Sequence, residues 1–299
     1  MNDWILSLAG TEAGHRAALG LALAAAVLHA LFGALQKGRH DPWLSRAAID
    51  ICYGAIALPV ALFVVPWPEP HMWPIFFGAF VIHAAYKWLQ AMTFSRGAYT
   101  VVYPVVRGTG PLFTVLGAGF LFGEHYTPGQ WGGVAVLLAG IFGLALYNAR
   151  YLREARETLA SALFFAVLTG MFVALYTTYD AYGIRATANP FTFLAWFFVM
   201  DAISMPVMMA GRLRTVPRHE LGPLFRRGLT GAIVAFLSFG SILMATRLDK
   251  VGQAAVLRET STVFAALIGW LVLGEKVGPS RAALMGLIAA GAVIVEFAR

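Results

Sequence analysis

Charged residues are scarce in this sequence. Asp, Glu, Lys and Arg make up 12% of its 299 residues, about half of the roughly 25% that a soluble domain carries. A folded chain with so little charge cannot cover a water-facing surface, and a disordered chain would be polar, so both classes are excluded. The single cysteine, Cys52, lies in an apolar run, which excludes a disulfide scaffold.

Apolar side chains are abundant instead, at 59% of the residues. Runs of about 20 apolar residues, which cross roughly 30 Å of hydrocarbon, predict membrane-spanning helices. Because the runs are continuous rather than alternating, a β-barrel is excluded and an all-α integral membrane protein is predicted. The ten predicted spans are approximately 17–36, 46–66, 73–94, 99–122, 129–148, 159–183, 191–211, 228–246, 251–273 and 280–297.

The distribution of Lys and Arg predicts how the spans are oriented. The connections after odd-numbered spans, counted to include Arg46, hold 14 of these residues, and the opposite side with both termini holds 5. This bias predicts termini outside the cell and a multi-pass protein of the bacterial inner membrane. The net charge of +7 then reflects cytoplasmic loops. Because the basic residues are scattered over short connections, no nucleic-acid partner is expected.

The chain matches itself at an offset of 151 residues. Two five-span halves, 1–150 and 151–299, are therefore predicted, and the odd number of spans places the second half upside down. Inverted repeats of this kind are typical of secondary transporters, which bind their solute near the midplane between the halves. The matched residues are rare polar ones inside or beside apolar runs: Arg107 with Arg258, Asp50 with Asp201, and Gly123-Glu124 with Gly274-Glu275.

Two segments resemble a known family. Residues 103–111 followed by Gly123-Glu124, and residues 257–265 followed by Gly274-Glu275, resemble the signature of the EamA-type, ten-span branch of the drug/metabolite transporter superfamily. The resemblance covers nearly the whole chain. It implies two inverted five-helix halves around a central cavity, often in exporters of amino acids or other small metabolites. One departure is the loop between Pro66 and Trp73, which lacks the Lys and Arg that place the termini of many relatives inside.

Three of the 22 basic residues lie well inside predicted spans, namely Lys87, Arg107 and Arg258. A charge at the bilayer centre costs between about 3 and more than 10 kcal/mol, so each needs a partner or a wet cavity. We predict that Arg107 and Arg258 contact an anionic group of the solute, because a guanidinium suits a carboxylate or a phosphate-like group. The alternative is an internal ion pair, between Arg258 and a nearby acid, that holds helices together.

Two prolines interrupt the fourth span. Pro104 and Pro111 flank Gly108-Thr109-Gly110, and a proline removes a backbone donor from a helix. In membranes, irregular backbone is tolerated where it is buried in protein or lines water. The pattern predicts a discontinuous helix at the solute site, with a packing kink as the alternative.

The third span carries a polar stripe. His83, Lys87 and Gln90 lie at i, i+4 and i+7, on one face of a helix, and Tyr86 flanks them. We expect this face to line the cavity; the alternative is that Lys87 reaches towards the head groups. Tyr103, Tyr176 and Tyr179 are further candidates for lining the cavity, and Tyr103 and Tyr179 are expected to pack on the solute. The candidates for a coupling proton are Glu259, Asp180 and His29.

The other acidic residues are expected to serve structure. Asp50 and Asp201 are predicted to pair with basic loop residues, and the Gly-Glu pairs at 124 and 275 are interpreted as helix ends rather than ligands. No phosphate-binding loop, His-Glu-x-x-His or Cys-x-x-Cys is present, so no nucleotide, metal or cofactor is predicted.

These observations favour a secondary transporter that is not an enzyme. It would move a small anionic or zwitterionic metabolite (an amino acid, organic phosphate or phosphonate) by alternating access, as an exporter or a proton/solute exchanger. The expected partners are the solute and the bilayer, and the expected state is a monomer or weak homodimer. The alternatives are a flippase of a lipid-linked headgroup, which would open a polar lateral gap, and an intramembrane enzyme, whose nucleophile and base the sequence does not bring together.

Overall fold

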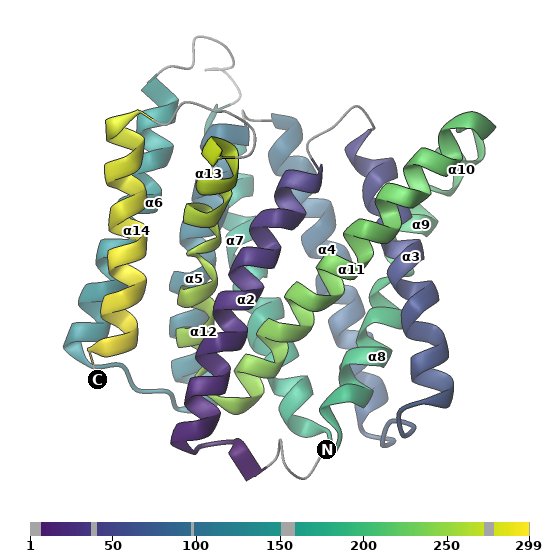
Figure 1. Cartoon of the computed structure of the whole chain (residues 1–299), viewed down its shortest axis with the longest axis horizontal. Coiled ribbons are helices and arrows are strands. Elements are labelled where there is room, and N and C mark those ends of the chain that lie inside the picture. The colour runs from purple at the N-terminus through teal and green to yellow at the C-terminus, as the bar shows by residue number, and fades with distance from the viewer. Residues whose placement is uncertain (1–6, 37–40, 97–98, 151–158, 272–277, 299) are drawn as a thin grey trace.

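The computed structural model describes residues 7–36, 41–96, 99–150, 159–271 and 278–298, and all regular structure within these ranges is helical (Figure 1). This confirms the predicted all-α class. The helices are α2 (Glu12–Gln36), α3 (Pro42–Phe63), α4 (Met72–Arg96), α5 (Tyr99–Phe122), α6 (Pro128–Arg150), α7 (Leu159–Ala186), α8 (Pro190–Asp201), α9 (Ser204–Met208), α10 (Ala210–Arg214), α11 (Arg218–Leu248), α12 (Val251–Arg258), α13 (Ser261–Leu271) and α14 (Pro279–Phe297).

Eight segments within the described ranges are helical, long and apolar enough to cross a membrane. The two predicted spans outside this set are 73–94 and 251–273. The first forms α4, in which His83, Lys87 and Gln90 dilute the apolar run. The second is divided into α12 and α13 at Glu259 and Thr260, so neither part reaches the length of a span alone. The chain is a multi-pass membrane protein.

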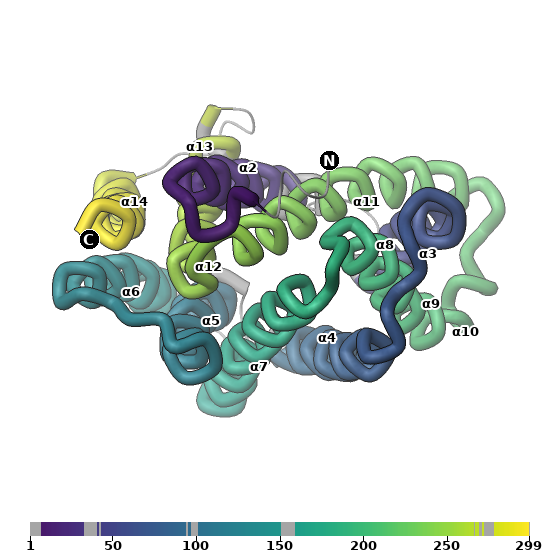
Figure 2. The backbone as a smooth tube through the Cα atoms, turned by 90° about the horizontal axis from the view of Figure 1, so that it is seen from below, coloured from purple at the N-terminus to yellow at the C-terminus, as the bar shows by residue number. Residues whose placement is uncertain are grey.

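The two halves are interlaced. α7 packs along α4 and α5, and α2 packs along α11, α12 and α13 (Figure 2). The offset of 151 residues relates these two sets of contacts, because it places α2 on α7, α4 on α11, and α5 on α12 and α13. α2 begins and α14 ends at the same end of the bundle, which we call the terminal face (Figure 1).

α6 and α14 meet along a seam of glycines. A Cβ atom on Gly140 would lie 2.8 Å from the carbonyl oxygen of Leu284, and one on Gly291 would lie 2.7 Å from that of Gly133. Small residues allow transmembrane backbones to approach this closely, where van der Waals contact holds helices together. Gly140 and Gly291 are partners under the repeat offset, so the seam joins corresponding helices of the two halves.

The prediction of a discontinuous fourth span is wrong. α5 runs without a break through Pro104 and Pro111. Threonine hydroxyls supply donors to carbonyls in this stretch: Thr109 Oγ1 donates to Val105 at 2.7 Å, and Thr114 Oγ1 donates to Gly110 at 2.9 Å. Threonine hydroxyls that bond to a carbonyl one turn earlier in this way are compatible with a continuous helix. The breaks occur instead in the seventh span, after α8, and in the ninth, between α12 and α13.

The Gly123-Glu124 pair does end a helix, as predicted. Gly123 follows the last residue of α5 and has a φ of 64°, which favours glycine. The Glu124 carboxylate crosses to the other half and accepts hydrogen bonds from the main-chain N–H groups of Val251 (2.6 Å) and Gly252 (3.1 Å). It therefore caps the start of α12. The corresponding Gly274-Glu275 pair lies outside the described residues.

Candidate functional site

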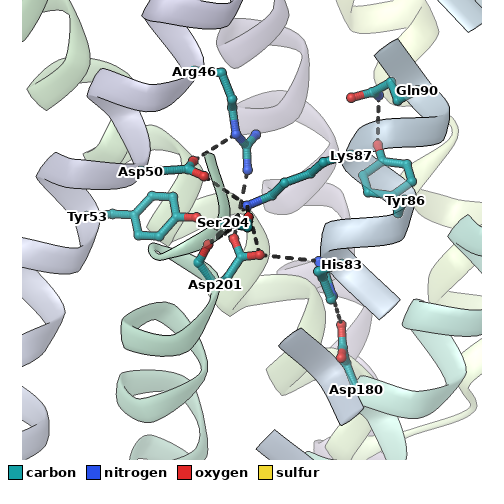
Figure 3. A network of polar contacts seen from close by, with 10 residues as sticks. All are labelled: Arg46, Asp50, Tyr53, His83, Tyr86, Lys87, Gln90, Asp180, Asp201 and Ser204. Carbon is teal, nitrogen blue, oxygen red and sulfur yellow. Dashed lines mark hydrogen bonds and ion pairs between the residues drawn. The ribbon is translucent and has the colours of Figure 1, made fainter. Parts of the chain in front are cut away.

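Lys87 lies at the centre of a buried polar network formed by α3, α4 and the α8–α9 connection (Figure 3). Its Nζ atom is 2.9 Å from Oδ2 of Asp50 and 2.9 Å from Oδ1 of Asp201, and it donates to Oγ of Ser204 at 3.2 Å. Lys87 is 6% exposed and Asp50 is fully buried. The lysine therefore points into the bundle and not towards the lipid head groups.

Arg46 and Tyr53 complete this network, which we call the Lys87 network. Nε of Arg46 is 2.8 Å from Oδ1 of Asp50, Nη2 is 3.9 Å from Asp201, and the Tyr53 hydroxyl donates to Asp201. Two cations thus face two carboxylates.

The assignment of Arg46 to a loop is wrong, because α3 begins at Pro42 and places Arg46 one turn inside the helix. Asp50 and Asp201 do pair with basic residues, but these lie in helices and not in loops. The i, i+4 spacing of Arg46 and Asp50, which favours ion pairs on a helix, is the signal that identifies the missed residue.

Repeat partners meet in the Lys87 network. The offset of 151 relates Asp50 to Asp201 and Tyr53 to Ser204, and all four surround one lysine (Figure 3). α3 and α8, which carry the two aspartates, pack against each other. The network therefore lies where corresponding helices of the two halves meet.

His83 extends the polar stripe of α4 towards α7. Its Nε2 atom is 2.7 Å from Oδ2 of Asp180, and its ring centroid is 4.7 Å from that of Tyr176. One turn further along α4, the Gln90 amide donates to the Tyr86 hydroxyl at 2.8 Å, and the Tyr86 ring meets the Tyr176 ring edge-on at 4.9 Å. The stripe predicted from sequence is thus a row of side chains that ends at Tyr176.

Arg107 contacts two residues that lie close in sequence to Arg258, its partner under the repeat offset. Its Nε atom is 2.8 Å from Oε2 of Glu259, and its Nη2 atom donates to Oγ of Ser261 at 2.8 Å. The ring of Tyr103 lies 6.0 Å from the guanidinium carbon. The structure thus contains an internal ion pair between the halves, but it is made by Arg107 and not by Arg258.

Arg258 has a different environment. It is the last residue of α12, directly before the break, and is 7% exposed. Its Nη2 atom donates to the Tyr176 hydroxyl at 3.3 Å. Among the described residues no carboxylate lies within ion-pair distance of it, whereas Arg46, Lys87 and Arg107 each contact one. Among the described residues Arg258 is thus the central cation without a direct ion pair, and the Glu259 and Asp180 carboxylates lie within electrostatic reach of it.

The remaining candidates lie around these groups. His29 of α2 is partly buried within electrostatic reach of Arg107 and Arg258. Tyr179 lies elsewhere, against α4, where its hydroxyl fills the space beside Gly78. Tyr176, one turn earlier on α7, is the tyrosine that reaches Arg258. Over the ranges that the structure describes, no group of three or more His, Cys, Asp or Glu side chains is placed to hold a metal ion.

Comparison with known proteins agrees with this architecture. The model of the EamA-like transporter family matches residues 16–146 and again residues 160–297. An uncharacterised protein of Sinorhizobium fredii, y4nH, is 28% identical over 103 residues, which cover 33% of this chain and 88% of that protein. A solved structure, described only as the crystal structure of a protein, shares the fold with a TM-score of 0.76 at 19% identity, over 94% of this chain and 99% of that one.

Proposed function

This chain belongs to the EamA-like transporter family, and from that premise we propose that it is a secondary transporter of a small organic anion or zwitterion. The observation that carries the proposal is the pairing of the buried charges at the centre of the helix bundle. Three of its cations contact carboxylates, whereas Arg258 contacts the Tyr176 hydroxyl alone among the described groups. A buried cation without a carboxylate is costly in a membrane, and a solute anion removes that cost.

The surroundings of Arg258 suit the acidic group of a small solute. A guanidinium offers two parallel N–H donors to a carboxylate or phosphate, and the Tyr176 hydroxyl adds a donor or acceptor beside it. α13 begins three residues after Arg258, so the break between α12 and α13 lies beside the guanidinium. The rings of Tyr86, Tyr176 and Phe239 pack together nearby and offer an apolar surface to the rest of the solute.

Arg107 and Lys87 rank behind Arg258 as solute contacts. Their charges are held by Glu259 and by the two aspartates of the Lys87 network, so a solute would have to displace a carboxylate to reach them. In the proposed site Arg107 keeps Glu259 and Ser261 in place beside Arg258.

Alternating access is the mechanism that we propose. Contacts between the halves meet at the centre: Arg107 of the first half holds Glu259 and Ser261 of the second. One helix break, after Arg258, lies beside these contacts, and the other, after Asp201, lies beside the Lys87 network. Breaks of this kind absorb changes in helix direction, so the two halves can change their packing around a central solute.

The test is substitution of Arg258 in purified, reconstituted protein. Amino acids, organic phosphates and phosphonates are first screened for thermal stabilisation in detergent, and hits are measured by counterflow in sealed liposomes. We expect Arg258→Gln to abolish both the ligand-dependent shift and counterflow, and Arg258→Lys to retain part of each. The matched control is Arg226→Gln, which changes an exposed arginine of α11.

The stability of the empty protein separates a solute contact from a structural role. Removing a buried cation that lacks a carboxylate partner should leave the melting temperature of the solute-free protein unchanged or raise it. Normal counterflow by Arg258→Gln contradicts the proposed site. Chemical conversion of the solute in detergent contradicts the proposed transporter and favours an enzyme.

A further inference from the structure

His15 lies in the first turn of α2 at the terminal face and links two carboxylates of the other half. Its Nδ1 atom contacts Oδ2 of Asp249, in the connection between α11 and α12. Its Nε2 atom is 2.8 Å from Oε1 of Glu296, near the end of α14. The second oxygen of Glu296 accepts a hydrogen bond from the Gln253 amide of α12. One imidazole ring thus joins the first helix of one half to three segments of the other.

The hydrogen bonds among His15, Asp249 and Glu296 indicate how many protons these three side chains hold. An ionised carboxylate only accepts, so each contact between a ring nitrogen and a carboxylate oxygen needs one proton. A neutral imidazole carries a single N–H, and His15 makes two such contacts. The three side chains must therefore hold two protons, one more than a neutral histidine with two ionised carboxylates.

We propose that His15, Asp249 and Glu296 form a proton-binding site that closes the terminal face, and that this face opens when the site releases its extra proton to the water there. After release, a neutral ring donates to one carboxylate and its bare nitrogen faces the other, so one of the two contacts is lost. The consequence for solute movement rests on the transporter function proposed above; the closure itself does not.

A small cavity lies behind the His15 site. It has a volume of about 10 Å³, which is room for about one water molecule, is partly open to solvent, and is bounded by His15, Asp249 and Glu296. Its wall continues along Gln253 and Leu257 of α12. Leu257 directly precedes Arg258, so the cavity and the proposed solute contact share helix α12.

The neighbouring charged groups do not replace the histidine. Glu12 and Arg16 of α2 pair with each other, and each side chain is 75% exposed. Lys250 donates to the main-chain oxygen of His125 at 2.9 Å, and Arg185 of α7 donates to that of Asp249 at 2.7 Å. Arg247 of α11 donates to the main-chain oxygen of Ile184. His15 is therefore the group that bridges the Asp249 and Glu296 carboxylates.

The test measures the accessibility of the cavity at two pH values. In full-length Cys52→Ser protein, Ala254→Cys is labelled with a membrane-impermeant thiol reagent at about pH 5.5 and about pH 8, on either side of the ordinary histidine pKa. We expect slow labelling at the lower pH and fast labelling at the higher one. Comparing variants at the same pH cancels the ionisation of the thiol itself.

Two substitutions should shift the result in opposite directions. His15→Gln removes the cation that holds both carboxylates, so we expect fast labelling at both pH values. In Asp249→Asn, the amide can donate to the bare ring nitrogen, so a neutral histidine keeps both contacts and labelling should stay slow at both. His219→Gln, at an exposed histidine of α11, is the matched control and should behave as the parent.

Equal ratios of labelling at the two pH values in the parent, His15→Gln and Asp249→Asn proteins would overturn the proton site. Labelling requires no solute, so the outcome is independent of the transporter proposal. A pH-dependent closure without counterflow of any solute would contradict only the transporter proposal. Counterflow with the same labelling ratios in all variants would contradict only the proton site.

Discussion

The sharpest stability prediction concerns Lys87→Met. The substitution keeps the approximate length of the side chain but removes its charge. The ammonium group lies 2.9 Å from both Asp50 and Asp201, so its loss leaves Arg46 to face two buried carboxylates. At an effective dielectric constant of about 20, unit charges at this separation attract by about 6 kcal/mol, partly offset because the lysine no longer loses its hydration. Breaking a buried ion pair costs about 3–5 kcal/mol. At about 2–4 °C per kcal/mol, the melting temperature should fall by about 10 °C.

The charge count supplies the control for this prediction. Lys87→Met leaves one cation and two carboxylates, whereas adding Asp50→Asn restores one of each, so the double variant should recover most of the loss. Lys250→Met removes a lysine that donates to a main-chain carbonyl and lies 5.5 Å from the centre of the Tyr126 ring, with no carboxylate in ion-pair contact among the described groups, and should change the melting temperature little. The assay is thermal unfolding in detergent, followed by size exclusion. A single variant as stable as the parent, or a double variant no better than the single, would refute the reasoning.

Three further predictions follow from other contacts. Gly291→Leu should destabilise the protein by about 1–3 kcal/mol because its side chain meets the main chain of α6, whereas Gly286→Leu on the same helix meets open space and should be tolerated in the same thermal assay. Glu124→Gln should cost about 0.5–2 kcal/mol and speed amide exchange at the start of α12, since it weakens the cap across the halves. Partial burial alone would raise the pKa of the Asp41 carboxyl, but hydrogen bonds from Arg212 and two main-chain N–H groups lower it below its ordinary value. The charged form therefore stabilises the fold above the unfolded pKa of about 3.9, and the difference between Asp41→Asn and the parent should be present near neutral pH and vanish as the pH falls through the lowered pKa.

Much of the fold follows from sequence because hydrophobic length and repeated polar residues are local signals. The apolar runs predict the helices, and the offset that matches Arg107 with Arg258 and Asp50 with Asp201 predicts which residues have no place in lipid. The start of α3 is also readable, since Asp41 caps it and Pro42 occupies its first turn. Using that signal places Arg46 inside the helix.

The pairing of the central charges could not be predicted in the same way. Whether Arg107 meets a solute or Glu259 depends on how two helices more than a hundred residues apart are rotated against each other, and periodicity within one helix does not determine that rotation. The prediction that the prolines break the fourth span failed for a related reason. A proline removes a backbone donor, but whether the helix bends or breaks depends on the packing and the other donors around it, and α5 continues through both prolines.

The interlacing of the halves has a consequence for biosynthesis. α2 has its main packing partners in α11, α12 and α13, and α6 packs through its glycines against α14, all of which are synthesised later than α2 and α6. The first half therefore enters the bilayer with two surfaces whose partners have not been made. The bundle therefore cannot assemble half by half, and the helices of the first half stay exposed to quality-control proteases until α14 is inserted.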